Sequence, residues 1–128
     1  MKFINKLIIF LIIISLYSCS GNKKKDSIIQ EIDQEQEMIS AYNEGLKNLD
    51  SGDAFYAAKN FLEAELLFPQ SELASKSALM AAYSYYIQDY YVEAIFNLER
   101  FIKTYPLDDR MDYVHYLLAM CYYENIEG

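Results

Sequence analysis

The sequence has no Trp, one His, two Cys and little Gly or Pro: among its 128 residues only 4 are Gly and 2 are Pro. This scarcity favours long helices joined by short turns, because both Gly and Pro destabilise helix interiors. With a single His, the sequence offers no recognisable catalytic arrangement based on His. Its His and Cys residues also do not occur at the spacing of metal ligands. We therefore predict an all-α protein that is not an enzyme and uses no cofactor and no metal.

The lone His115 and the second cysteine, Cys121, are interpreted as packing residues. In a helix, His115 would lie beside Met111 and Ala119, and Cys121 stands in an apolar helical stretch. A Cys in such surroundings behaves as a small buried hydrophobe rather than as a nucleophile.

Charge is unevenly distributed along the chain. Residues 1–25 hold five Lys and no acid, whereas residues 26–128 hold all 19 acids against 6 Lys and Arg, a net charge of −13. An acidic body with few Arg does not match the negative phosphate backbone of a nucleic acid. Nucleic acid is therefore excluded as a partner.

Residues 1–18 are predicted to be a signal peptide. Lys2 and Lys6 supply the basic start, and residues 7–16 form an apolar run of ten that contains a single Ser. This run is too short for a transmembrane helix, which needs about 20 residues.

The sequence LYSC at residues 16–19 resembles the lipobox of bacterial lipoproteins, although Tyr17 is larger than the residue usual there. The resemblance implies that Cys19 becomes the acylated N-terminus and anchors the protein in a membrane; a secreted protein with an unmodified Cys19 is the alternative. Residue 20 is Ser and not the Asp that commonly retains such lipoproteins at the inner membrane, which favours the outer membrane. Residues 19–36 are then the lipidated Cys and a polar tether.

Residues 37–128 are predicted to form the folded domain, a series of helices. The first helix is expected to begin at about Gln34. Apolar residues then recur at helical spacing, at Ile39, Tyr42, Leu46 and Leu49, and Gly52 is placed to end the helix. The four helices expected after it run from a cap at Asp53 to Phe68, from a cap at Ser71 to about Gln88, from Asp89 to Tyr105, and from Asp109 to about Glu124. Expected inward-facing residues are Ala57, Phe61, Ala64 and Phe68 on the second helix and Val92, Ile95, Leu98 and Ile102 on the fourth.

A repeat with an offset of 37 residues relates these helices. Residues 57–69 (AAKNFLEAELLFP) match residues 94–106 (AIFNLERFIKTYP), and the same offset aligns Gly45, Ala82 and Ala119. A fixed period of this size indicates stacked helical hairpins.

The hairpins resemble tetratricopeptide repeats. Gly45, Ala57, Phe61, Ala64 and Pro69 supply the small, aromatic and Pro positions of one repeat, and Ala82, Tyr85, Ala94, Leu98 and Pro106 supply those of the next. Together with Cys19, the run from residue 42 to residue 123 resembles the BamD family of tetratricopeptide lipoproteins. The resemblance implies about two and a half of that family's five repeats, and so the N-terminal part of a longer protein.

Tyrosine is abundant, with 13 residues, and offers apolar area together with a polar tip. In tetratricopeptide hairpins the first helix of each pair lines the concave surface, and we therefore predict a peptide-binding groove on these helices. The alternative for each Tyr is that it packs between neighbouring helices. The predicted groove residues are Tyr42, Leu46, Tyr83, Tyr86, Tyr116, Met120 and Tyr123, with Leu49 and Leu79 beside them.

The family resemblance implies a lipid-anchored scaffold of the β-barrel assembly machinery on the periplasmic face of the outer membrane. Its expected partners are unfolded outer-membrane proteins, the POTRA domains of BamA and other subunits of the complex. Two alternatives remain open: a tetratricopeptide lipoprotein that organises peptidoglycan or envelope enzymes, and a lipoprotein hydrolase with a catalytic domain downstream.

Overall fold

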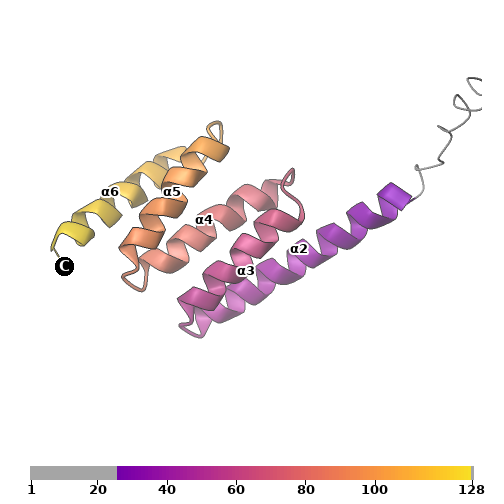
Figure 1. Ribbon diagram of the computed structural model, residues 1–128, viewed down its shortest axis with the longest axis horizontal. Helices are drawn as coiled ribbons and strands as arrows, with labels where there is room; N and C mark the ends of the chain where they lie inside the picture. Colours follow the sequence, from indigo (N-terminus) through magenta and orange to yellow (C-terminus); the bar gives the residue numbers. More distant parts are fainter. Residues whose placement is uncertain (1–25, 128) are drawn as a thin grey trace, which may run out of the picture. The chain divides into compact units, whose positions relative to one another are not determined.

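The computed structural model describes residues 26–127, and these residues form five α-helices without a strand (Figure 1). The predicted signal peptide, Cys19 and the tether up to residue 25 lie outside the described residues. The all-α prediction is confirmed. The helices are α2 (Asp26–Asp50), α3 (Ala54–Leu67), α4 (Glu72–Tyr86), α5 (Tyr91–Thr104) and α6 (Met111–Glu127).

Local signals place most helix ends where the sequence predicts them. The Asp53 carboxylate caps α3 by accepting a hydrogen bond of 3.2 Å from the Tyr56 amide, and the Ser71 hydroxyl caps α4 in the same way at Ala74, 3.1 Å. Gly52, with φ +82°, supplies the left-handed turn between α2 and α3.

Three helix starts differ from the sequence prediction, and one of them is that of α6, which begins at Met111 and not at Asp109. Asp89 does not open α5: it adopts φ 63°, a left-handed conformation that Asp tolerates, and the helix begins two residues later at Tyr91. The first helix begins at Asp26 and not near Gln34, because the intervening residues, DSIIQEID, contain no Gly or Pro to interrupt it. Residues 26–36 are therefore helical, and their role as a tether stays a prediction.

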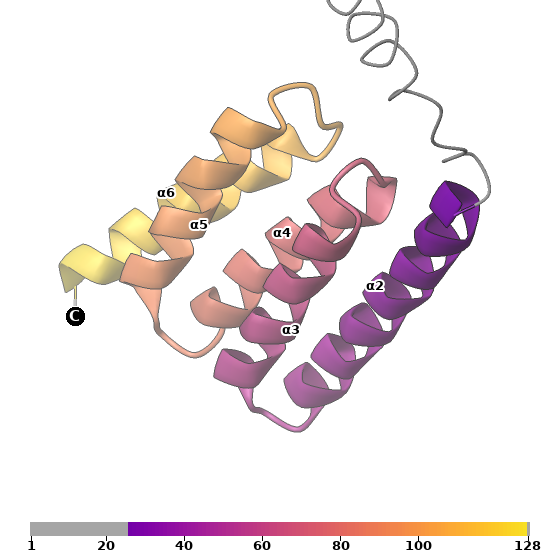
Figure 2. The ribbon, with the colours of Figure 1, turned by 45° about the vertical axis from the view of Figure 1, so that its right-hand side comes forward.

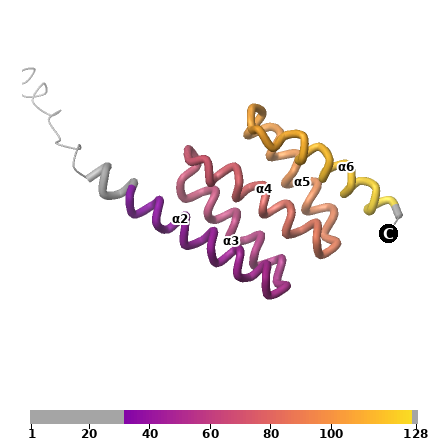
Figure 3. Tube along the Cα trace, turned by 180° about the vertical axis from the view of Figure 1, so that it is seen from behind, coloured from indigo at the N-terminus to yellow at the C-terminus, as the bar shows by residue number. Residues whose placement is uncertain are grey.

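Consecutive helices pack as antiparallel hairpins, with α3 against α4, α4 against α5 and α5 against α6. In Figure 2, α3 crosses in front of α4, and α5 in front of α6; Figure 3 shows the same helices from behind. This arrangement confirms the predicted tetratricopeptide-like hairpin fold for the described residues.

The small and aromatic positions of the repeat form the core. Ala57, Phe61 and Ala64 of α3 are fully buried, as are Ala82 of α4 and Ala94 of α5. Short side chains at these positions let neighbouring helix backbones approach one another, and the larger Phe61, Leu98 and Phe101 fill the space between them.

Several predicted core faces are shifted by one residue. On α2 the buried stripe contains Met38, Tyr42 and Gly45, whereas Ile39 and Leu46 are 43% and 37% exposed. On α5, Val92 points outward and is 65% exposed. A helical apolar stripe is wide enough to allow either register, and only the neighbouring helix selects one.

The sequence predicts that both His115 and Cys121 pack in the helical core, and the structure confirms this only for Cys121. His115 is exposed, so its assignment to the helix interface is wrong; residues 114 and 117 of α6 take that place. Cys121 is fully buried as predicted, and burial raises the pKa of its thiol to about 11, so that it remains protonated and unreactive at neutral pH.

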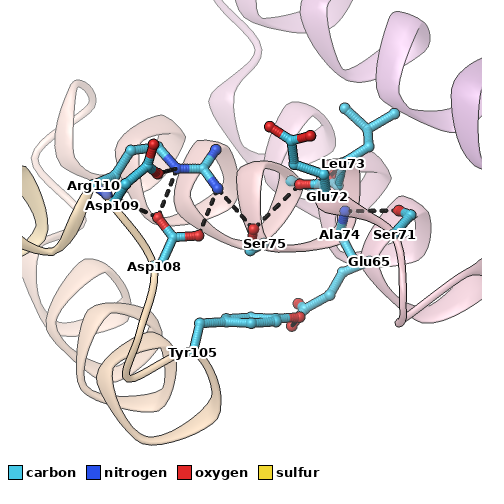
Figure 4. Close-up of polar contacts among 11 residues, drawn as sticks. Glu65, Ser71, Glu72, Leu73, Ala74, Ser75, Tyr105, Asp108, Asp109 and Arg110 are labelled. Atoms are coloured by element: carbon cyan, nitrogen blue, oxygen red, sulfur yellow. Dashed lines mark hydrogen bonds and ion pairs between the residues drawn. The ribbon is translucent and has the colours of Figure 1, made fainter.

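Two polar clusters tie consecutive hairpins together, and Figure 4 labels Glu65 and Tyr105 of the first and Ser75, Asp108 and Arg110 of the second. Arg100 of α5 donates two hydrogen bonds, of 2.7 and 2.6 Å, to the buried Glu65 carboxylate of α3, and the Tyr105 hydroxyl donates a third of 2.8 Å. In the loop before α6, Arg110 pairs with Asp108 at 2.6 Å and donates to Ser75 of α4 at 2.7 Å. Both clusters connect residues 35 or more positions apart, and so they hold one hairpin to the next.

Candidate peptide-binding groove

Tyrosine side chains gather where α4 and α6 lie close together. Tyr83 and Tyr86 are three residues apart on α4, and Tyr113 and Tyr116 have the same spacing on α6, which places each pair on one face of its helix. The rings of Tyr113 and Tyr116 lie 6.4 Å apart between centroids. Burial and then the neighbouring Tyr83, Tyr86 and Tyr116 raise the pKa of the Tyr113 phenol.

Tyr91 at the start of α5 extends this group. Its ring centroid lies 6.1 Å from that of Tyr86, and its hydroxyl donates a hydrogen bond of 2.6 Å to the Asp89 carboxylate. That hydrogen bond is the main cause that raises the Tyr91 pKa to about 12. We call Tyr83, Tyr86, Tyr91, Tyr113 and Tyr116 the tyrosine patch.

The tyrosine patch is accessible to solvent. Tyr113 and Tyr116 are 42% and 60% exposed, and Tyr83 and Tyr86 are half-buried. The pKa of Tyr86 is raised by burial and then by Glu124, so its phenol stays uncharged through the neutral range. Asp89 and Glu124 add negative charge at the edge of the patch. The surface can therefore bind apolar side chains on its ring faces. At its edge, the carboxylates of Asp89 and Glu124 can accept hydrogen bonds or bind cationic groups.

The predicted groove residues fall into three groups. Tyr83, Tyr86 and Tyr116 belong to the tyrosine patch. Met120 lies one turn beyond Tyr116 on the same face of α6 and is half-buried. Tyr123 lies two turns beyond Tyr116 and is 59% exposed.

Tyr42 and Leu46 of α2 form the third group. Tyr42 is only 8% exposed: its ring packs 5.3 Å from Phe61, and the Lys76 ammonium lies 5.4 Å from the ring centroid. Leu46 is 37% exposed. The structure therefore gives Tyr42 a packing contact, and peptide binding by any of the seven residues stays a prediction.

Sequence reasoning missed two members of the tyrosine patch. Tyr113 could have been found from its spacing of three residues to Tyr116, which is the spacing that relates Tyr83 to Tyr86. No comparable signal marks Tyr91, because its position depends on the turn at Asp89 that brings the start of α5 back to the end of α4.

Comparison with known proteins gives the family. The model of the YfiO family, described as outer membrane lipoprotein, matches residues 34–128. The chain belongs to the YfiO family. Three similar relatives bear the name outer membrane protein assembly factor BamD: those of Caulobacter vibrioides, 36% identical over 91% of this chain; Rickettsia prowazekii, 32% over 94%; and Neisseria gonorrhoeae, 32% over 84%.

The YfiO-family chain spans less than half of these relatives. The matched regions cover 37%, 46% and 40% of the Caulobacter, Rickettsia and Neisseria proteins. Within residues 26–127, no helix combines the length and the apolar character needed to cross a bilayer, and no three ligating carboxylate, His or Cys side chains gather to hold a metal.

Proposed function

We propose that this YfiO-family chain takes part in outer-membrane protein assembly and that it holds unfolded β-barrel chains on the tyrosine patch. The observation that carries the proposal is an accessible surface of five tyrosines, built from α4, α5 and α6 of a hairpin scaffold. The name of the similar BamD proteins, assembly factors of outer-membrane proteins, supports the same process.

An aromatic surface suits this ligand for a physical reason. An unfolded strand of a β-barrel is extended, with apolar and polar side chains in alternation, and it offers no rigid shape to complement. Tyr side chains bring large area at low conformational-entropy cost, and their hydroxyls can bond to the polar groups between the apolar ones. Ring stacking therefore binds such a segment without requiring a defined secondary structure.

The remaining parts of the proposal concern placement and partners. Acylated Cys19 anchors the chain at the periplasmic face of the outer membrane, and the chain acts by binding, without catalysis. Its partners are unfolded outer-membrane proteins, the POTRA domains of BamA and other subunits of the assembly complex. The family description as outer membrane lipoprotein supports the anchor and the membrane.

The test is a binding titration with a fluorescent peptide that ends in the alternating aromatic pattern of a barrel's last strand. Replacing Tyr83 and Tyr86 together by Ala should weaken binding by about 1 to 3 kcal/mol, because anchoring aromatic side chains contribute on that scale. Tyr116→Ala should also weaken it, and this side chain is exposed enough that its loss leaves the fold intact.

The matched control is Tyr56→Ala, since Tyr56 is similarly exposed, at 57%, but lies on α3 outside the tyrosine patch. Circular dichroism and thermal melts of every variant separate lost binding from lost folding. Unchanged affinity in folded Tyr83/Tyr86 and Tyr116 variants, or an equal loss with Tyr56→Ala, would remove the tyrosine patch from the function.

A further inference from the structure

A second surface lies on α3, away from the tyrosine patch. Phe55, Leu62 and Leu66 lie along α3, at intervals of seven and four residues, and together with Tyr85 of α4 they line a pocket of about 520 Å³. Phe55 is 59% and Leu66 76% exposed, although both are large apolar side chains. The volume is within the range of ligand-binding pockets, about 300 to 1,000 Å³.

The pocket is preformed by aromatic packing. The ring of Phe55 stands edge-on to Tyr85, with 6.3 Å between centroids, and Tyr85 stands edge-on to Tyr90 at 6.4 Å. Tyr85 is itself 9% exposed, so one wall of the pocket is part of the core and is fixed by it.

An acidic pocket continues from the apolar one. It has a volume of about 320 Å³, and Glu37 and Glu44 of α2 line it together with Glu63 and Leu67 of α3. Glu63 and Leu67 line both pockets, which makes the two one continuous surface. We call it the α3 surface.

The charge of the α3 surface is only partly compensated. Glu44 pairs with Lys47 at 3.2 Å, whereas within residues 26–127 Glu37 and Glu63 form no ion pair. Lys59 is the one basic side chain that lines either pocket in that part of the chain. The surface therefore presents a bulky apolar site next to excess negative charge.

This combination decides between occupants. A second copy would bring another acidic chain, with a net charge of −13 over residues 26–128, against the same three Glu. An anionic lipid headgroup would meet the same repulsion. A segment with a large apolar side chain and adjacent Lys or Arg would fill the apolar pocket and neutralise the Glu side chains.

We propose that the α3 surface is a docking site for a basic segment of a partner protein. A bulky apolar side chain of that segment lies among Phe55, Leu62 and Leu66. Its Lys or Arg side chains lie beside Glu37 and Glu63. The site is separate from the tyrosine patch, because the two share no residue. Tyr85 and Tyr86 are neighbours on α4, where successive side chains diverge by about 100°. None of the five tyrosines of the patch lines either pocket of the α3 surface.

The test uses two fluorescent amphipathic peptides of 16 residues, one with a Leu and Phe face and a Lys face, the other with Glu in place of every Lys. The full chain is held in nanodiscs of phosphatidylcholine, and binding is followed by anisotropy at low and high salt. The Lys peptide should bind, and binding should weaken at high salt because surface charges are screened. The Glu peptide should not bind.

The variants separate the two halves of the α3 surface. The affinity for the Lys peptide should fall about tenfold or more in each of two variants, Leu66→Asp and the double variant Glu37→Lys with Glu63→Lys. A tenfold loss corresponds to about 1.4 kcal/mol. The charge-reversed pair should gain binding of the Glu peptide. Leu107→Asp is the matched control, since Leu107 is a 97% exposed Leu outside both pockets, and it should change nothing.

Other occupants give distinct results. Leu66-dependent sedimentation with anionic vesicles would indicate a lipid surface, and a Leu66-dependent dimer in analytical ultracentrifugation would indicate a second copy; either would overturn the proposal. So would equal binding of the two peptides, or Lys-peptide affinity that Leu66→Asp and the charge reversal leave unchanged. Tyr116→Ala should leave this binding intact, and so a failure here is distinct from a failure of the tyrosine patch.

Discussion

Gly45 sets the distance between α2 and α3. A Cβ atom at this position would lie 2.7 Å from two atoms of the Phe61 ring, which is shorter than any unstrained carbon contact. The ring cannot move away freely, since it is fully buried and Tyr42 packs against it. A single missing methyl group therefore permits the close packing of the first hairpin.

Gly45→Ala should lower the free energy of unfolding by up to about 2 kcal/mol, as measured by urea denaturation. Ala favours a helix over Gly by about 1 kcal/mol, but overpacking a rigid core costs about 1 to 3 kcal/mol. The sign of the result shows which effect is larger.

A double-mutant cycle with Phe61→Leu identifies the cause of that loss. With a smaller side chain at position 61, Gly45→Ala should become neutral or stabilising, because the helix preference remains and the collision is removed. A destabilisation of the same size in both backgrounds would show that the Phe61 ring is not its cause.

At the scale of elements, the Glu65 cluster joins α3 to α5. The Glu65 side chain is 6% exposed and accepts both hydrogen bonds from Arg100 and one from Tyr105. Burying a carboxylate to this extent costs hydration free energy, which its hydrogen-bond partners must offset.

Arg100→Met should destabilise the protein by about 2 to 3 kcal/mol in urea melts at neutral pH. Removing one partner of a buried ion pair costs about 3 to 5 kcal/mol, and the cost is lower here because the Arg100 side chain is 31% exposed and solvent screens its charge. Tyr105→Phe should cost less, about 1 kcal/mol, since Arg100 still compensates the charge.

The matched control is Lys47→Met, which breaks the pair with Glu44 on α2. Those two side chains are 74% and 52% exposed, so this loss should be at most about 1 kcal/mol. Equal effects of Arg100→Met and Lys47→Met would mean that the Glu65 cluster does not hold the two hairpins together.

At the scale of the whole molecule, the chain combines an acidic helical body with a basic start. The five Lys of residues 1–25 precede a body with a net charge of −13. An acidic body is repelled by anionic headgroups, and so its stable placement at a membrane depends on the acyl chains proposed at Cys19. Each buried CH₂ contributes about 0.8 kcal/mol, and two chains suffice for stable anchoring.

Cys19→Ser should leave an uncleaved precursor or release the protein from the outer-membrane fraction. Cell fractionation with mass spectrometry of the purified protein measures both outcomes. The control is Cys121→Ser, which keeps the LYSC sequence and should fractionate as the unaltered protein does. Recovery of Cys19→Ser in the outer membrane, at the mass of the processed and otherwise unmodified chain, would refute the lipid anchor.

Most helix ends, and the hairpin repeat, could be predicted because they depend on residues close together in sequence. Asp53 and Ser71 cap helices through contacts three residues away, and the offset of 37 residues repeats the small positions that become the core. The faces of α2 and α5 could not be assigned with the same accuracy. Ile39 and Val92 are as apolar as their buried neighbours, and only packing leaves them outside.

The sequence by itself determined an all-α chain of repeated hairpins, because helix caps, turn residues and a fixed period act locally. Only the tertiary structure decided which tyrosines are available to a ligand: Tyr42 is covered by Phe61 and Lys76, whereas Tyr113 and Tyr116 of α6 remain exposed beside α4. It also decided the pairing of Glu65 with Arg100 and the exposed pocket on α3. Burial and pairing depend on which helices become neighbours, and that choice is made by packing across residues far apart in the chain.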